Sequence, residues 1–86
     1  MVDAQFVVKN KVGLHARPAN LLIKEAIKFK SNIRIKKGNT EVNAKSIISV
    51  LTLGAKMGDK IVVKADGPDE LEALSSILEL LERLKE

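Results

Sequence analysis

The apolar residues of this chain switch between two spacings, and the order of the switches limits the folds it can adopt. The alternating spacing that is typical of half-buried strands occurs at residues 4–8, 33–35 and 61–65. The three-or-four-residue spacing that is typical of amphipathic helices occurs at residues 16–28, 47–53 and 71–84. A chain of 86 residues in which strands and helices are mixed in this way is long enough for one two-layer domain, which we expect to span residues 1–86.

Turn and capping residues separate these runs. Gly38-Asn39 is a two-residue loop of the kind that joins two antiparallel strands, so we expect residues 40–43 to form a second hairpin strand. Ser46 is suited to cap the N-terminus of the short helix, and Gly54 to end it. Gly67-Pro68-Asp69 opens the final helix, with the proline and acidic residues in its first turn.

The predicted order is therefore strand, helix, strand, strand, helix, strand, helix. An antiparallel hairpin combined with amphipathic helices favours an α+β fold, with the helices on one face of the sheet and the other face in solvent. We expect the first helix to bury Ala16, Ala19, Leu22, Ile23, Ala26 and Phe29. We expect the last helix to bury Leu71, Leu74, Ile77, Leu78, Leu81 and Leu84.

The composition argues against several classes of site and location. There is no cysteine and only one histidine, so we expect no disulfide, no metal site and no cofactor. We see neither a signal-peptide pattern nor an apolar run long enough to span a membrane, and we expect a cytoplasmic monomer without direct membrane insertion. Residues 1–64 carry a net charge of +9 and residues 65–86 a net charge of −5, which suggests that the basic part meets acidic partners.

The only histidine lies in the run Gly13-Leu14-His15-Ala16-Arg17-Pro18-Ala19. Gly13 supplies a turn, and Pro18 fits the first turn of a helix, where its missing N–H is not needed. His15 is thus expected at a helix N-terminus, where free backbone N–H groups and the helix dipole bind anions such as phosphate. A lone histidine at a helix start is more often an exposed residue or a cap, but here a nucleophile, a guanidinium and an anion site fall within four residues.

Three segments of the chain resemble the HPr family, the histidine-containing phosphocarriers of the bacterial phosphoenolpyruvate:sugar phosphotransferase system. The run 13–19 is similar to the family's phosphorylation site, and Lys45-Ser46-Ile47-Ile48 to its regulatory serine segment. Leu51-Thr52-Leu53-Gly54 is similar to the end of the family's short second helix. The resemblance covers essentially the whole chain, and it implies an open-faced sandwich with a four-stranded antiparallel sheet of order 1-4-2-3 under three helices.

The resemblance implies that His15 accepts a phosphoryl group from phospho-Enzyme I, itself charged from phosphoenolpyruvate, and passes it to enzyme IIA components of sugar transporters. Arg17 would neutralise the phosphate charge, and the backbone N–H groups of Ala16 and Arg17 would bind its oxygens. Neutral imidazole is nucleophilic near neutral pH, which suits this role. The chain would then be a carrier and not an enzyme, and any magnesium would belong to Enzyme I.

The resemblance also implies a docking surface and a regulatory site. A helix as short as 47–53 cannot bury all its apolar residues, so some should form an exposed patch. The expected docking residues are Ala16, Asn20, Lys24, Ile47, Ile48 and Leu51. Ser46 is both the expected helix cap and, in family members that have the HPr kinase/phosphorylase, the residue that this enzyme phosphorylates. The seryl-phosphorylated form partners a catabolite-control transcription regulator in those members.

Three alternatives remain open at this stage. The residues Val12-Gly13-Leu14 are also similar to the nitrogen-related branch of the family, which uses the same chemistry in a parallel phosphorelay. A small basic RNA-binding domain would suit the charge and the element order, but the chain has only Phe6 and Phe29 as aromatic residues. A hydrolase that uses His15 would need a carboxylate partner, for which Asp66 and Glu86 are the candidates.

Overall fold

The structure, a computed structural model, describes residues 1–84, which form four strands and three helices. In chain order these are β1 (Val2–Val7), α1 (Ala16–Ala26), β2 (Asn32–Lys37), β3 (Thr40–Asn43), α2 (Ile47–Leu53), β4 (Lys60–Asp66) and α3 (Glu70–Arg83). The predicted order of elements is therefore confirmed.

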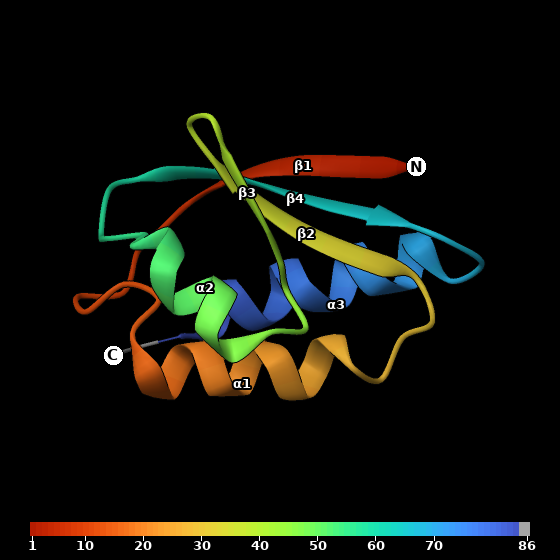
Figure 1. Ribbon diagram of the computed structural model, residues 1–86, viewed down its shortest axis with the longest axis horizontal. Coiled ribbons are helices and arrows are strands. Elements are labelled where there is room, and N and C mark those ends of the chain that lie inside the picture. Colours follow the sequence, from red (N-terminus) through yellow and green to blue (C-terminus); the bar gives the residue numbers. More distant parts are fainter. Residues whose placement is uncertain (85–86) are drawn as a thin grey trace.

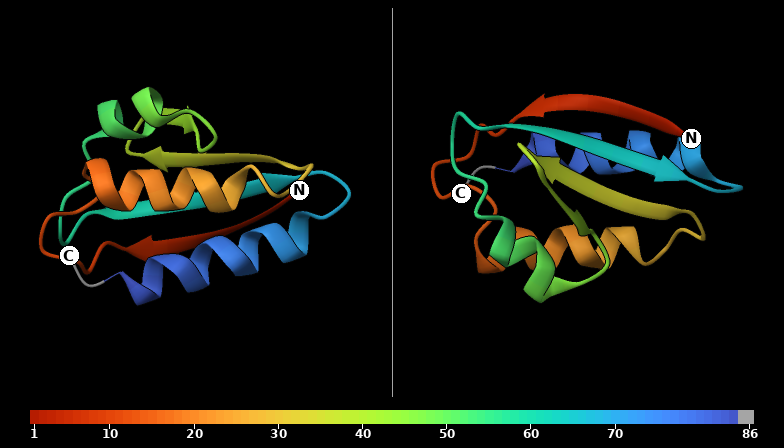
Figure 2. Two further views of the ribbon diagram at one scale, coloured as in Figure 1. Left: turned by 90° about the horizontal axis from the view of Figure 1, so that it is seen from below. Right: turned by 45° about the horizontal axis from the view of Figure 1, so that its top comes forward.

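The four strands form one sheet in the order β1-β4-β2-β3, and every neighbouring pair is antiparallel. Figure 1 shows the sheet as one layer and the helices as a second layer on a single face. Seen from below, α1 and α3 lie side by side under the sheet, with α2 beside them (Figure 2). The fold is the expected α+β open-faced sandwich, and the strand order that the family resemblance implied is confirmed.

The core fills the space between these two layers. From the sheet, alternate residues point inward and are buried: Phe6, Ile33, Ile35, Ile61, Val63 and Ala65. From the helices, the buried residues include Ala19, Leu22, Val50, Ala73, Ile77 and Leu81. Strand alternation and helical spacing thus converge on one apolar layer, as the sequence pattern requires.

The hairpin between β2 and β3 has the predicted two-residue loop. Lys37 pairs with Thr40, and only Gly38 and Asn39 lie between them. Gly38 has φ +59, whereas Asn39 does not have a positive φ. A positive φ at the first loop position alone is the signature of a type II′ turn, one of the two turn types that match the twist of a hairpin.

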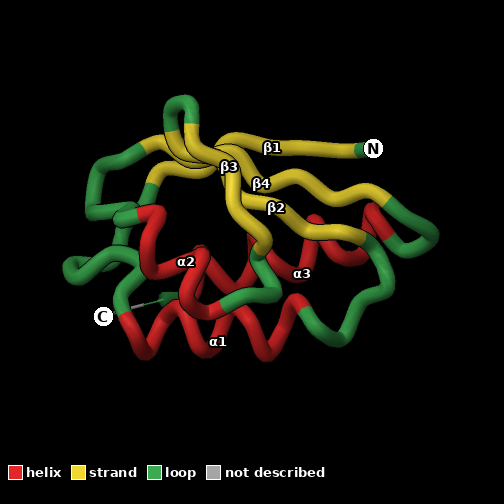
Figure 3. The backbone as a smooth tube through the Cα atoms, in the orientation of Figure 1, coloured by secondary structure: helices red, strands yellow, loops and turns green. Residues whose placement is uncertain are grey.

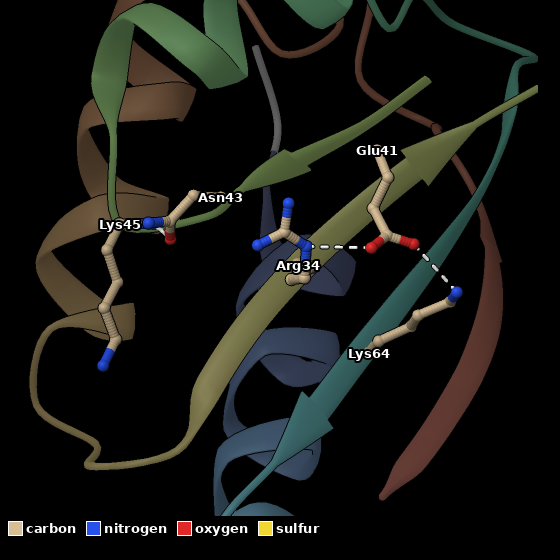
Figure 4. A network of polar contacts seen from close by, with 5 residues as sticks. All are labelled: Arg34, Glu41, Asn43, Lys45 and Lys64. Carbon is tan, nitrogen blue, oxygen red and sulfur yellow. Dashed lines mark hydrogen bonds and ion pairs between the residues drawn. The ribbon is translucent and has the colours of Figure 1, made fainter. Parts of the chain in front are cut away.

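On the open face of the sheet, one carboxylate bridges two cationic side chains from neighbouring strands (Figure 4). Glu41 accepts a hydrogen bond from Arg34 Nε at 2.8 Å and another from Lys64 Nζ at 2.8 Å. The Lys64 ammonium, followed by the Arg34 guanidinium, holds the pKa of the Glu41 carboxyl below its usual range. Arg34 and Lys64 lie directly opposite each other on β2 and β4, so Glu41 offsets a repulsive cross-strand pair.

Several predicted element boundaries were wrong by one or two residues. The first helix ends at Ala26 and not at residue 28, because the N–H groups of Lys28 and Phe29 donate to Glu25 and Ala26, three residues back. Such short-range bonds tighten the last turn and end the helical ladder. The first strand covers Val2–Val7, and Val8 is buried just beyond it, where it pairs with the 58–59 turn instead of a strand.

Two residues predicted to be buried are exposed. Ala16 faces solvent, and Pro18 takes its place in the buried stripe of α1. Leu71 is 71% exposed, and Ala73 is the first buried residue of α3. The prediction placed Pro68 in the first turn of this helix, but α3 begins at Glu70 after Asp69 as its N-cap.

Among residues 1–84, no helix has the length and apolar character needed to cross a membrane.

Candidate functional site

His15 occupies the N-cap position of α1, as the sequence predicted. Its backbone is extended, with φ −83° and ψ −171°, and its carbonyl accepts the first helical hydrogen bond from Ala19 N–H at 2.8 Å. The imidazole is exposed and makes no capping hydrogen bond to the helix. The N–H groups of the first turn have no acceptor within a helix, so the side chain stands beside a favourable position for an anion.

The loop before His15 is held in one shape by Gly13 and its neighbours. Gly13 donates to the carbonyl of Asn10 at 3.1 Å, and the side-chain amide of the buried Asn10 donates back to the carbonyl of Gly13. Leu14 is buried, and its N–H donates to the carbonyl oxygen of Ala55 at 3.0 Å. His15 is therefore anchored through its preceding residue to the segment that follows α2. The loop before α1 and the loop after α2 lie at the same end of the molecule (Figure 3).

The segment after α2 is itself fixed by Asp59. This carboxylate accepts the backbone N–H of Lys56 at 2.8 Å and forms an ion pair with Lys37 at 3.0 Å. The Lys56 N–H, followed by the Lys37 ammonium, holds the pKa of the Asp59 carboxyl below its usual range. Lys37 also donates to the carbonyl of Gly54 at 3.0 Å, so both ends of this short segment are tied to the end of β2.

These two segments enclose an open hollow of about 440 Å³ beside His15. Its lining consists of Val12, Leu14, His15, Ala16, Leu51, Gly54, Ala55 and Lys56. The lining is mainly apolar, and its two ionisable residues come from different segments, His15 from the start of α1 and Lys56 from the segment after α2. Arg17, the cation that the sequence predicted for this site, is exposed on the first turn of α1 and does not line the hollow.

Sequence reasoning missed Lys56. A lysine in a loop carries no signal of its own, and Lys56 is 41 residues from His15 in the sequence. The available clue was Gly13, since a glycine before the key histidine can permit close approach of another backbone. A Cβ on Gly13 would lie 2.8 Å from Lys56 Cα, so the glycine does allow that approach.

The apolar patch predicted on α2 is exposed. Ile48 is 72% exposed, Leu51 39% and Ile47 36%, whereas Val50 and Leu53 are buried. Leu51 also lines the hollow, so the patch is continuous with the surroundings of His15. On the neighbouring helix α1, Asn20 and Lys24 are exposed, as are Ala16 and Arg17.

Ser46 is the N-cap of α2, as predicted. Its hydroxyl accepts the N–H of Ser49 at 3.4 Å, and the residue is half-buried. Gly54 ends the helix in the left-handed conformation, with φ 66°, which also agrees with the prediction. The neighbouring Lys45 donates its ammonium to the carbonyl of Phe29 at 2.7 Å, so it ties the start of α2 to the segment after α1.

Asp66, one of the carboxylates considered as a partner for His15, lies at the opposite end of the molecule. Asp66 pairs with the amino group of Met1 at 3.6 Å, at the end of β4 away from the 56–59 segment. A seven-residue strand separates the two places by about 20 Å. Glu86, the other candidate, lies outside the described residues, and within residues 1–84 no cluster of carboxylates or histidine could hold a metal ion.

Comparisons with known proteins identify the family of the chain. Residues 2–83 match the family model described as "PTS HPr component phosphorylation site". Phosphocarrier protein HPr of Mycoplasma genitalium is 49% identical over 86 residues, which cover 99% of this chain and 98% of that protein.

Two solved structures of HPr from Thermoanaerobacter tengcongensis are also similar, each at 44% identity. The crystal structure of HPr-C-His superposes with a TM-score of 0.93 and covers 95% of this chain and 92% of that one. A second crystal structure, described as an HPr dimer, superposes with a TM-score of 0.76 and covers 95% and 94%. The match over nearly the whole chain, in sequence and in fold, shows that this protein belongs to the HPr family of phosphocarriers of the phosphotransferase system.

Proposed function

We propose that His15 is the residue on which this phosphocarrier holds its phosphoryl group. The observation that carries the proposal is the exposed imidazole at the N-cap of α1, beside a hollow large enough for a phosphate. An imidazole nitrogen attacks the phosphorus of the donor, the bond from phosphorus to the donor breaks, and a phosphorus–nitrogen bond forms. The N–H groups of the first turn, at Ala16 and Arg17, bind the oxygens that carry the charge.

The donor we propose is phospho-Enzyme I, and the acceptors are enzyme IIA components that serve sugar uptake. A carrier must present one surface to several partners, and the exposed patch of Ile47, Ile48 and Leu51 adjoins the hollow. Exposed Asn20 and Lys24 extend this surface along α1. Apolar contacts at the centre with cations at the rim suit partners that have an acidic surface.

The direct test is phosphoryl acceptance. The protein is incubated with phosphoenolpyruvate, magnesium and Enzyme I, and the acid-labile phosphate is located by mass spectrometry. We expect one phosphate on His15, and its transfer when a IIA protein is added. The His15→Ala variant should accept none and keep its circular dichroism spectrum, because the ring is exposed. Acceptance by that variant would contradict the assignment, as would failure of the wild type to accept phosphate from an Enzyme I that is active on a control carrier.

We also propose that phosphorylation of Ser46 regulates docking, through a kinase of the HPr kinase/phosphorylase type and with a catabolite-control transcription regulator as partner. Ser46 directly precedes Ile47 and Ile48 of the exposed patch, so a phosphate there adds negative charge at the docking surface. Ser46→Asp should slow acceptance from phospho-Enzyme I. Asn39→Asp, which adds one charge at the exposed hairpin loop, is the control and should not. Equal rates in both variants would mean that docking does not involve this segment.

The RNA-binding alternative receives no support from the fold. Both aromatic residues of the chain belong to the core, where Phe6 is buried and Phe29 is partly buried. The open face of the sheet therefore has no aromatic residue on which a base could stack.

We propose that the carrier acts in the cytoplasm as a monomer. A monomer leaves the docking patch free for successive partners, whereas a relative from T. tengcongensis has been solved as a dimer. Light scattering across a range of protein concentrations distinguishes the two states. A constant mass of about one chain, 9.4 kDa, supports the proposal, and a concentration-dependent dimer would overturn it.

A further inference from the structure

The hollow beside His15 is lined by a cationic residue that is different from the one in the sequence motif. Lys56 lines this hollow and Arg17 does not. Other lining residues, such as Leu14, Leu51 and Ala55, are apolar. A phosphoryl group attached to His15 and directed into the hollow would thus meet a surface whose only other ionisable side chain is a lysine.

The backbone of Lys56 is held close to that of the histidine loop. Leu14 N–H donates to Ala55 at 3.0 Å, and a Cβ on Gly13 would lie 2.8 Å from Lys56 Cα. The Lys56 N–H is fixed by Asp59 at 2.8 Å. This anchoring sets the origin of the Lys56 side chain, while its flexible four-carbon stem remains able to move the ammonium toward a bound anion.

The ammonium of Lys56 is available for such a contact. Its side chain is exposed, and within residues 1–84 its ammonium forms no ion pair or side-chain hydrogen bond, although its charge acts on the Asp59 carboxylate. The one carboxylate nearby, Asp59, is already engaged by the ammonium of Lys37 and by the Lys56 backbone. A lysine in this position adds positive charge near the helix N-terminus, so a phosphate could contact both the N–H groups and the ammonium.

We propose that the Lys56 ammonium pairs with the phosphoryl group of phospho-His15 and is a phosphate-binding residue of this carrier, an inference that rests on the proposed role of His15. No bond to Lys56 forms or breaks. The ammonium stabilises the dianionic phosphoryl group while it is carried, together with the N–H groups of the α1 N-terminus.

The test measures the phosphoryl group itself and needs no partner protein. Wild type, Lys56→Gln, Lys56→Arg and Lys30→Gln are phosphorylated chemically with phosphoramidate, and the ³¹P chemical shift of phospho-His15 is followed against pH. Lys30→Gln removes one charge from an exposed lysine in the loop after α1, beyond the far end of that helix from His15, and is the matched control. Because Lys56 favours the dianion, its removal should raise the pKa of the phosphoryl group by about half a unit.

The outcomes are distinct. The proposal is supported if the phosphoryl pKa rises in Lys56→Gln and returns to the wild-type value in Lys56→Arg, with Lys30→Gln unchanged. An unchanged phosphoryl pKa in Lys56→Gln overturns it, even if transfer from Enzyme I is slower, because Lys56 would then contact the partner and not the phosphate. Failure of every variant to accept phosphate from Enzyme I would instead contradict the proposed function, since the chemical phosphorylation does not depend on that step.

Discussion

Gly13 is the residue that most tightly determines where His15 lies. It has φ +66, and a Cβ there would lie 2.3 Å from the carbonyl oxygen of Ala55. The left-handed backbone alone costs other residues about 1–2 kcal/mol. The close approach to Ala55 adds a collision with backbone atoms that cannot rotate away.

We therefore predict that Gly13→Ala lowers the free energy of unfolding by more than about 2 kcal/mol. Gly54→Ala is the matched control, because Gly54 has the same φ of +66 in the left-handed region and its Cβ position meets only the carbonyl oxygen of Thr52, at 4.0 Å. The control variant should lower the free energy of unfolding only by the cost of the left-handed backbone, about 1–2 kcal/mol. Urea unfolding of both variants measures the difference, and equal losses would show that the approach of Ala55 imposes no additional constraint.

Asp69 joins the loop after α1 to the start of α3. Its carboxylate accepts the N–H groups of Lys30 and Ser31, each at 2.9 Å, and the hydroxyl of the buried Ser31 at 2.5 Å. The Ser31 hydroxyl, followed by the Lys30 N–H, lowers the pKa of the Asp69 carboxyl from 3.8 to about 2. The sequence suggested only a helix-opening acid here, because the partners of Asp69 are 38 and 39 residues away.

This lowered pKa predicts a pH dependence of stability. A carboxyl whose pKa is lower in the folded state stabilises the protein above its unfolded pKa, and this stabilisation is lost as the pH falls toward the folded pKa of about 2. Wild type should thus lose stability as the pH falls from about 5 to about 2. Asp69→Asn should be less stable at pH 7 and lose part of this dependence. Ser31→Ala keeps both backbone donors to Asp69, so its free energy of unfolding should lie between those of wild type and Asp69→Asn. Urea unfolding at each pH measures all three proteins.

At the scale of the elements, the hydrophobic pattern and the hairpin loop together predicted every helix and strand but not every buried face. For α3 it marked Leu71 as a core residue, because the leucine fits the helical spacing of Leu74 and Leu78. The structure instead centres the buried stripe on Ala73, Ile77 and Leu81. A helix with leucines on neighbouring sides has no unique apolar face, so its rotation is set by the sheet against which it packs.

The two kinds of leucine in α3 should respond differently to truncation. Leu81 is 2% exposed, so Leu81→Ala should lower the free energy of unfolding by about 2–5 kcal/mol. Leu71 is 71% exposed, and Leu71→Ala should change it by less than about 0.5 kcal/mol. Thermal and urea unfolding of the two variants check this orientation of the helix, and a large loss at Leu71 would contradict it.

At the scale of the whole molecule, the sequence predicted that His15 lies at the start of a helix, but it did not predict the hollow beside this residue. The motif around His15 is local, so its backbone conformation could be predicted from Gly13 and Pro18. The hollow exists because residues 12–16 and 51–56 are brought together by the packing of α2 and by the hydrogen bond from Leu14 to Ala55. Contacts between segments so far apart depend on the complete fold, and no local spacing encodes them.

The distribution of charge is also a property of the whole fold. Residues 1–64 carry +9, but ion pairs with Glu25, Glu41 and Asp59 engage several of these cations, and Lys9 pairs with Glu82 of α3 at 2.9 Å. Around the proposed site, Lys11, Lys24 and Lys56 are exposed and have no ion pair among the described residues. Part of the positive charge that remains available to an acidic partner thus lies near His15, while other exposed lysines such as Lys30 lie away from it.

We predict that the second-order rate constant for acceptance from phospho-Enzyme I falls at least about tenfold as the ionic strength rises from about 0.01 M to about 1 M. Over this range the Debye length shrinks from about 30 Å to about 3 Å, which removes long-range attraction but leaves short contacts. Rapid-quench kinetics measure the rate constant, and Lys11→Gln/Lys24→Gln should give a shallower salt dependence. Spontaneous hydrolysis of phospho-His15, a unimolecular step, is the control for salt effects on the phosphoryl bond. A rate constant that does not change with salt, while circular dichroism shows an intact fold, would mean that the lysines near His15 do not steer the encounter.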